Sequence, residues 1–201
     1  MNTPSHGILN LALLTTPAYP EATLSIVVRA ILPDMLMFAM YFWAKCVRRQ
    51  PEKQIWTEIY YQPLWQNLTH AFHSIPLKII GIAIAYYLGY WQLTILLISA
   101  LAHSFLDFPI DDAHRHFYPF SNYCFISLIS YWNPKYHGRV VSFIERLLVL
   151  SATIYLFPLQ DSWVSQSLLI IVNIVYWIEY LYIRLFRRCS QAMIESQIKS
   201  Y

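Results

Sequence analysis

Long apolar segments separated by short polar breaks follow one another along this chain and predict helices. The first two span residues 6–16 and 21–43 and are separated by the sequence PAYP. Four more span residues 75–88, 91–108, 141–157 and 163–186. A helix that crosses a bilayer needs about 20 predominantly apolar residues, and most of these segments approach that length. The pattern therefore predicts an all-α protein whose helices lie largely in a membrane.

Two stretches depart from this apolar pattern. Residues 55–74 are amphipathic and rich in aromatic side chains, which is typical of a segment at the membrane surface. Residues 111–139 form a polar loop that contains His and Asp. Within the second apolar segment, Pro33 is expected to kink or interrupt the helix, which leaves Asp34 near backbone groups that lack their helical partners.

The composition supports a membrane protein. Hydrophobic residues make up 57% of the chain and charged residues 12%, whereas an ordinary soluble domain has about 25% charged residues. The length leaves room for roughly four to six membrane-embedded helices and no separate soluble domain. We therefore expect one integral membrane domain over residues 1–201, built as a polytopic helix bundle with a polar loop that carries His and Asp.

The distribution of charge indicates topology rather than nucleic-acid binding. The net charge is +3, and Lys and Arg occur in short clusters at the ends of apolar segments. Such clusters lie on the cytoplasmic side of a membrane. One topology places residues 45–53, Arg139 with Arg146, and Arg187 with Arg188 in the cytoplasm. In that topology the polar loop also faces the cytoplasm.

Two predicted hairpins bring His and Asp residues together. If the helices on either side of Gly89 are antiparallel, their equal rise of about 1.5 Å per residue places His73 level with residues 105–107. Folding the N-terminal segments about PAYP places His6 near the level of Asp34 in the same way. His and Asp are thus expected at the open ends of both hairpins.

The most specific local pattern is His103 followed four residues later by Asp107, because such a pair shares one face of a helix. It can direct an imidazole nitrogen and a carboxylate oxygen at one metal ion, and the alternative is a simple His–Asp hydrogen bond. Asp34 has apolar neighbours and either binds the metal or pairs with Arg29. Because ionisable groups at membrane depth are costly, their clustering favours a functional site.

Further histidines extend this candidate metal site. His70 and His73 share a face if their segment is helical, so one is a candidate ligand and the other a residue that orients it. The alternative is a pair of polar residues on an interfacial helix. His6, at the start of the first predicted helix, is a candidate terminal ligand.

The polar loop contributes two kinds of candidate. His114 and His116 are candidate metal ligands, and the alternative is a hydrated polar loop. Asp111 and Asp112 are candidate catalytic residues that accept a proton from an attacking water molecule. His137 precedes a glycine and is expected to have a capping or hydrogen-bonding role.

The order of these short motifs resembles a known family. The motifs are SHG (5–7), LPD (32–34), THAFHS (69–74), AHSFLD (102–107) and DDAHRHFYPFS (111–121). They resemble the bacterial family of inner-membrane proteins known as membrane-bound, metal-dependent hydrolases, whose pattern is similar to the ligand order of zinc-dependent phospholipase C. The resemblance covers roughly the first 120 residues, and it implies metal roles for His6, Asp34, His73, His103 and Asp107. The usual Thr-His-Ser motif of the family is interrupted here, so either His70 or His73 corresponds to its histidine.

The sequence therefore predicts a membrane-bound hydrolase with a divalent metal. Mixed nitrogen and oxygen ligands suit zinc, with manganese or iron as alternatives. A site at headgroup depth on the cytoplasmic side of a bacterial inner membrane favours a phosphoester or ester of an amphiphilic substrate. The alternative is a non-catalytic scaffold or assembly factor with a structural His/Asp cluster. A transporter is favoured least. It would need acidic residues along a path through several spans, and Asp34 and Glu179 are the only good mid-helix candidates that the sequence offers.

Overall fold

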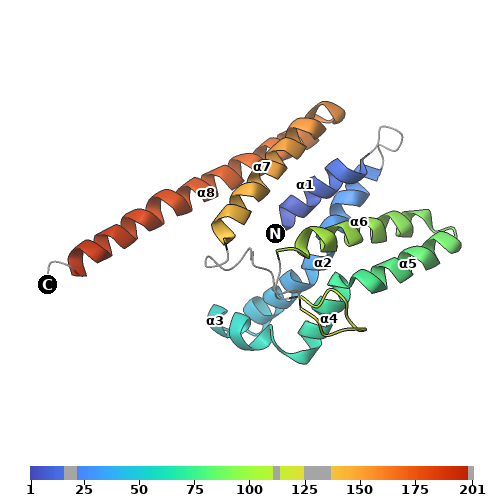
Figure 1. The fold of residues 1–201 in the computed structure, drawn as a ribbon, viewed down its shortest axis with the longest axis horizontal. Coiled ribbons are helices and arrows are strands. Elements are labelled where there is room, and N and C mark those ends of the chain that lie inside the picture. The colour runs from blue at the N-terminus through green and yellow to red at the C-terminus, as the bar shows by residue number, and fades with distance from the viewer. Residues whose placement is uncertain (16–21, 111–113, 125–136, 199–201) are drawn as a thin grey trace. The chain divides into compact units, whose positions relative to one another are not determined.

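The structure, a computed structural model, describes residues 1–15, 22–110, 114–124 and 137–198. These residues fold into helices and connecting loops (Figure 1). The chain divides into two compact units, Met1–Glu145 and Arg146–Tyr201. That they form one integral membrane domain over residues 1–201 stays a prediction. The predicted all-α architecture is confirmed for the described part of the chain.

The first unit contains six α-helices and two short π-helical segments before the polar loop. They are α1 (Thr3–Leu14), α2 (Ala22–Phe42), η1 (Trp43–Val47), α3 (Glu52–Gln54), η2 (Ile55–Ile59), α4 (Pro63–His73), α5 (Ile75–Tyr87) and α6 (Trp91–Asp107). The boundaries of the apolar segments were thus predicted to within a few residues. α2 continues through Pro33, so of the two predicted effects the interruption is wrong, while the kink stays a prediction.

The interior of this unit lies where α2 packs against α1, α4 and α6, while α5 packs along α6 (Figure 1). A buried polar contact joins three of these helices. Asn10 Nδ2 donates to the carbonyl oxygen of Ser99 at 2.8 Å, and Ser99 Oγ donates to the carbonyl oxygen of Ile26 at 3.0 Å. Such bonds fix the register of α1, α2 and α6, because a buried polar group without a partner is costly. Gly89, at φ 74°, supplies the left-handed residue that turns α5 into α6.

A separate apolar cluster holds the membrane-surface segment in place. Met40 and Ala44 pack against Ile55 and Ile59, and all four side chains are buried. Trp65 packs against the same cluster and so attaches the start of α4. The amphipathic segment predicted at residues 55–74 therefore forms η2 and α4, with its apolar face against the end of α2.

The second unit is a helical hairpin. It contains most of α7 (Gly138–Leu156), the short 3₁₀ segment η4 (Phe157–Leu159) and α8 (Trp163–Ile198). Arg146 Nε donates to the carbonyl oxygen of Tyr176 at 3.0 Å, and Asn173 Nδ2 donates to Thr153 Oγ1 at 2.7 Å. These hydrogen bonds join α7 to α8. α8 is longer than the predicted segment of residues 163–186.

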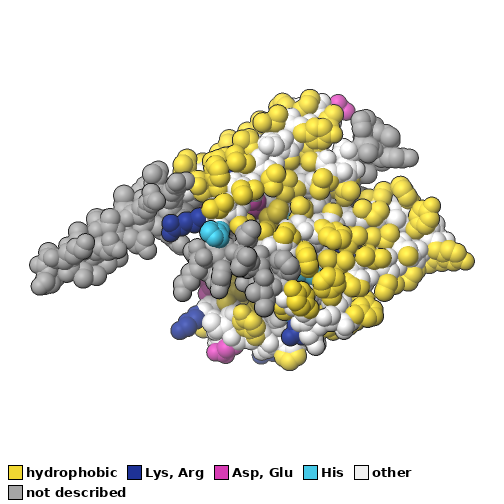
Figure 2. All heavy atoms as spheres, in the orientation of Figure 1, with side chains coloured by type: hydrophobic (Ala, Val, Ile, Leu, Met, Phe, Trp, Pro, Cys, Tyr) yellow, Lys and Arg dark blue, Asp and Glu magenta, His cyan; other side chains and the backbone are white. Residues whose placement is uncertain are grey.

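Three helical segments in the described part of the chain are long and apolar enough to cross a membrane: Ile26–Val47, Gly138–Leu159 and Trp163–Tyr182. The pair α4 and α5, bent by 55°, would be a fourth if it forms one broken span. Apolar side chains cover much of the surface of the α5–α6 hairpin in Figure 2, and Ile79, Ile80 and Ile84 are among those exposed. A soluble protein rarely exposes so large an apolar surface, so the structure fits an integral membrane protein.

Candidate metal centre

Five buried side chains from four helices gather in the interior of the first unit. His6 comes from α1, Asp34 from α2, His73 from the last residue of α4, and His103 and Asp107 from α6. The largest exposed fraction among them is 7%, for Asp34. These are the five residues to which the family resemblance assigned metal roles. They form two groups of three, each with ligand atoms close enough to hold a metal ion.

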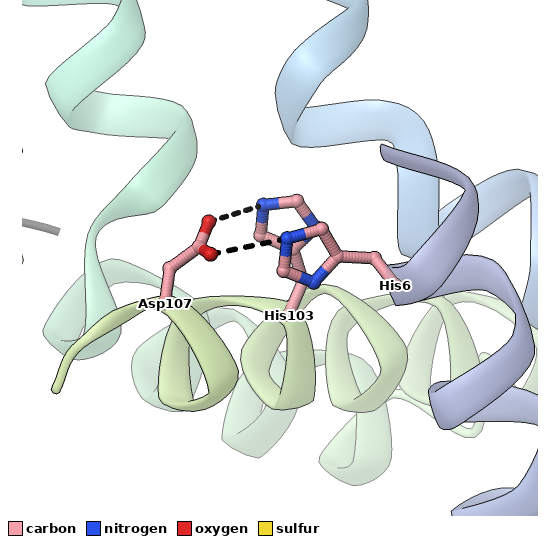
Figure 3. Close-up of side chains that lie close together, drawn as sticks. All are labelled: His6, His103 and Asp107. Atoms are coloured by element: carbon pink, nitrogen blue, oxygen red, sulfur yellow. Dashed lines mark ion pairs between the residues drawn. The ribbon is translucent and has the colours of Figure 1, made fainter. Parts of the chain in front are cut away.

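The first group consists of His6, His103 and Asp107 (Figure 3). Asp107 Oδ1 lies 3.1 Å from His6 Nε2, and Asp107 Oδ2 lies 3.3 Å from His103 Nε2. The two imidazole rings stack with their centroids 3.6 Å apart. The spacing of His103 and Asp107 by four residues therefore aligns them on one face of α6, as predicted.

The second group consists of Asp34, His73 and His103. Asp34 Oδ1 lies 3.6 Å from His73 Nε2 and 3.5 Å from His103 Nε2. His103 thus belongs to both groups. Ser104 Oγ donates to the carbonyl oxygen of His73 at 2.9 Å, which confirms that the hairpin at Gly89 brings His73 level with this part of α6.

In two of these histidines, the hydrogen bond at Nδ1 determines whether Nε2 can bind a metal ion. His103 Nδ1 lies 2.6 Å from the carbonyl oxygen of Ala30, and His73 Nδ1 lies 2.9 Å from that of Thr69. A carbonyl oxygen only accepts hydrogen bonds, so both Nδ1 atoms must carry a proton. In the neutral ring Nε2 then has a lone pair, which is the arrangement of a metal-binding histidine held by a backbone carbonyl.

These lone pairs lie opposite negative oxygens. The Nε2 atoms of His73 and His103 are buried and have no hydrogen-bond partner among the described residues, although each lies near a carboxylate. His6 Nε2 is buried as well and lies 3.1 Å from Asp107 Oδ1. A lone pair and a carboxylate repel unless a proton or a cation lies between them. Protonation of both the His73 and His103 rings would place two positive charges in close contact, whereas a divalent cation held by either group of three would satisfy the nitrogens and the carboxylate of that group. The side chains therefore fit a divalent metal ion.

His70 differs from His73 in the role of its Nδ1. The backbone N–H of Arg115 donates to His70 Nδ1 at 3.3 Å, so the proton of a neutral His70 is on Nε2. Neither nitrogen then offers a free lone pair. His70 does not belong to either group of three, and of the two candidates for the family's histidine, His73 is the one that the structure brings to Asp34.

The loop histidines lie beside the centre and outside both groups. The ring of His114 stacks on that of His73, with the centroids 4.2 Å apart. His116 is buried beside Phe108, and its carbonyl oxygen accepts a hydrogen bond from Ile75 N at 2.8 Å. These contacts hold the loop against the bend between α4 and α5. The predicted catalytic residues Asp111 and Asp112 lie outside the described residues.

Thr3 at the start of α1 and Met1 just before it contact the two carboxylates of the centre. Thr3 Oγ1 donates to Asp34 Oδ2 at 2.6 Å, and the N-terminal ammonium group of Met1 donates to Asp107 Oδ1 at 3.0 Å. The predicted approach of the N-terminal helix to the level of Asp34 is therefore confirmed, although PAYP itself lies outside the described residues. The alternative pairing of Asp34 with Arg29 is wrong, because Arg29 Nη1 donates to the carbonyl oxygen of Gln92 at 2.5 Å.

Two charged residues near the centre were not predicted from the sequence. Glu145 is 3% exposed, and its Oε1 accepts hydrogen bonds from Asn2 N at 2.8 Å and from Ser5 Oγ at 2.6 Å. Lys78 is buried in the apolar α5, where its Nζ donates to the carbonyl oxygen of Ala100 at 2.8 Å. A single charged residue inside an apolar run was a signal that could have indicated Lys78. The sequence around Glu145 is an ordinary amphipathic pattern.

His137 lies outside the centre. Its carbonyl oxygen accepts hydrogen bonds from Val140 N at 2.8 Å and Val141 N at 3.1 Å, at the start of α7. The predicted capping or hydrogen-bonding role of the His137 side chain stays a prediction.

No protein-family model matches this chain, and neither a curated protein nor a solved structure resembles it significantly.

Proposed function

We propose that this protein is a membrane-bound, metal-dependent hydrolase that cleaves a phosphoester or ester of an amphiphilic substrate. The observation that supports the proposal is a set of three buried Nε2 atoms that have no hydrogen-bond partner among the described residues and that lie beside two buried carboxylates. Buried groups of this kind are costly unless they bind something, and inside membrane proteins they mark functional sites.

The metal ligands in this proposal are His6, Asp34, His73, His103 and Asp107. Their mixed nitrogen and oxygen donors suit zinc, with manganese or iron as alternatives. A bound divalent ion of this kind polarises a phosphoryl or acyl oxygen and makes a water molecule more acidic. The chain itself must then supply a group that accepts the proton of that water molecule, which is the role that we assign to Asp111 or Asp112.

The depth of the centre favours an amphiphilic substrate. Asp34 lies within the candidate span Ile26–Val47, so the centre lies on a helix apolar enough to contact lipid. A substrate with an acyl chain would approach such a centre from the lipid, with its polar group at the metal. We further propose that the protein lies in a bacterial inner membrane with its basic segments in the cytoplasm, in agreement with the positive-inside rule.

The test is metal analysis and turnover of the purified protein in lipid nanodiscs. Wild type is expected to carry stoichiometric metal and to hydrolyse a lipid phosphodiester or carboxyl ester in a chelator-sensitive reaction. Replacing the proton acceptor, by Asp111→Asn or Asp112→Asn, is expected to lower kcat by about 10²- to 10⁴-fold with the metal retained. A wild type that binds metal but hydrolyses neither substrate would contradict the enzyme proposal and favour a scaffold with a structural metal.

A further inference from the structure

A second polar pocket lies at the end of the first candidate span, away from the metal centre. It is formed by η1, the loop that follows it and η2, and it has a volume of about 210 Å³. Its lining combines one cation with several hydrogen-bonding side chains. The lining residues used below are Trp43, Arg48, Gln50, Gln54, Glu58 and Gln62. None of them is part of the His/Asp cluster.

The cation of this pocket is held by an aromatic ring. The guanidinium carbon of Arg48 lies 4.8 Å from the centroid of the Trp43 ring, within the range of a cation–π interaction. This contact restricts the guanidinium group to the wall of the pocket. A planar guanidinium group with several N–H donors matches the oxygens of a phosphate group.

The remaining polar groups suit hydroxyl groups rather than a second anion. The carboxamides of Gln50, Gln54 and Gln62 each offer both donors and acceptors, and the carboxylate of Glu58 accepts hydrogen bonds. Gln54 Nε2 donates to Glu58 Oε2 at 3.0 Å, so the two side chains form one hydrogen-bonding wall. A hydroxyl group can donate to the carboxylate and accept from an amide, whereas a second phosphate would be repelled by Glu58.

The position of the pocket in the chain corresponds to the lipid headgroup region. The candidate span Ile26–Val47 ends one residue before Arg48. Three more basic side chains near the pocket are exposed, and they are Lys45, Arg49 and Lys53. Exposed aromatic side chains follow at Trp56 and Tyr61. Basic and aromatic residues directly after a span are typical of a segment that contacts anionic lipid headgroups.

We propose that this pocket binds the headgroup of an anionic phospholipid that carries hydroxyl groups, with Arg48 at the phosphate and the glutamines and Glu58 at the hydroxyls. The volume suits one small headgroup and excludes a folded partner. Bound lipid would link η1 to η2 and hold the membrane-surface segment against the end of α2. The proposal does not depend on the metal centre or on hydrolysis.

The experiment compares Arg48→Ala with Arg49→Ala. Both variants lose one positive charge at adjacent positions, but Arg49 does not line the pocket. Lipid binding is measured by native mass spectrometry of detergent-solubilised protein titrated with phosphatidylglycerol. Arg48→Ala is expected to bind this lipid at least about tenfold more weakly than Arg49→Ala, because hydrogen bonds to a charged group contribute about 1.5–3 kcal/mol. Equal losses in the two variants would show general electrostatic attraction and overturn the pocket.

The preference for hydroxyl groups is tested by comparing lipids whose headgroups differ in hydroxyl groups and charge. Wild type is expected to bind phosphatidylglycerol more tightly than phosphatidic acid, which has the phosphate without the glycerol hydroxyls, and more tightly than phosphatidylcholine. Gln54→Leu should remove the preference over phosphatidic acid. Equal binding of the two anionic lipids by wild type would overturn the hydroxyl part of the proposal. Arg48→Lys, which keeps the charge and loses the planar group, serves if Arg48→Ala does not fold. It should bind phosphatidylglycerol more weakly than Arg49→Ala does, yet keep the preference over phosphatidic acid, because that preference depends on Gln54 and Glu58.

Discussion

Replacing His103 by alanine is expected to remove the bound metal and to abolish metal-dependent turnover. Its Nε2 is the nitrogen that lies opposite both carboxylates, at 3.5 Å from Asp34 and 3.3 Å from Asp107. Loss of a residue that merely orients a ligand already costs about 10- to 100-fold in metal affinity or activity. The loss of a ligand common to both groups should therefore exceed about 100-fold. Metal content by mass spectrometry and equilibrium metal titration measure the effect.

His70→Ala is the matched control for this experiment. His70 is also a buried histidine near the centre, but its Nδ1 accepts the N–H of Arg115. We expect His70→Ala to keep stoichiometric metal. If His70→Ala loses the metal while His103→Ala keeps it, the ligand assignment is wrong. If wild type carries no metal and binds none on titration, the cluster is a set of hydrogen-bonded residues and the hydrolase proposal loses its basis.

Replacing Glu145 by alanine is expected to cause the largest loss of stability. The substitution removes a buried acceptor for Asn2 N and Ser5 Oγ. Two hydrogen bonds to a charged group contribute about 1.5–3 kcal/mol each, so the free energy of unfolding should fall by about 3 kcal/mol or more. Because α1 carries His6 and Thr3, loosening its first turn should also weaken metal binding. Denaturant-induced unfolding of the detergent-solubilised protein, with metal titration alongside, measures both effects.

Glu145→Gln separates this structural role from a requirement for charge. The amide oxygen of glutamine can accept the same two hydrogen bonds without the negative charge. We expect this variant to lose less than half as much stability as Glu145→Ala. Wild-type stability in Glu145→Ala would contradict the role assigned to the buried carboxylate. Loss of metal in Glu145→Gln without loss of stability would instead show that its charge acts on the centre.

The helices and the core of the centre were predictable because their signals are local or follow from simple geometry. Apolar segments defined the helices, the spacing of His103 and Asp107 placed both on one face, and equal rise along two hairpin arms aligned His73 with α6. The choice between His70 and His73 was not predictable, since it depends on which backbone group faces each Nδ1. Glu145 was missed because its partners are more than 100 residues away in sequence.

The contacts of the N-terminal helix were also only partly predictable from the sequence. Its position beside Asp34 followed from the hairpin prediction, but the bond from Thr3 to Asp34 depends on side-chain detail. Pro33 was expected to kink or interrupt α2, and the helix continues through this residue without interruption. A proline removes one hydrogen bond and crowds the preceding turn, and packing of α2 on three neighbouring helices evidently outweighs that cost.

The shared imidazole of His103 also limits how many ions the protein can hold at once. A neutral ring whose Nδ1 is protonated has a single lone pair, and that pair can coordinate one ion. An ion bound by His6, His103 and Asp107 would therefore leave no His103 lone pair for an ion at Asp34 and His73. An ion bound by Asp34, His73 and His103 would likewise leave none for an ion at His6 and Asp107. The two positions are mutually exclusive, so metal titration should saturate at one equivalent, with the ion exchanging between neighbouring sites that compete for the same ligand.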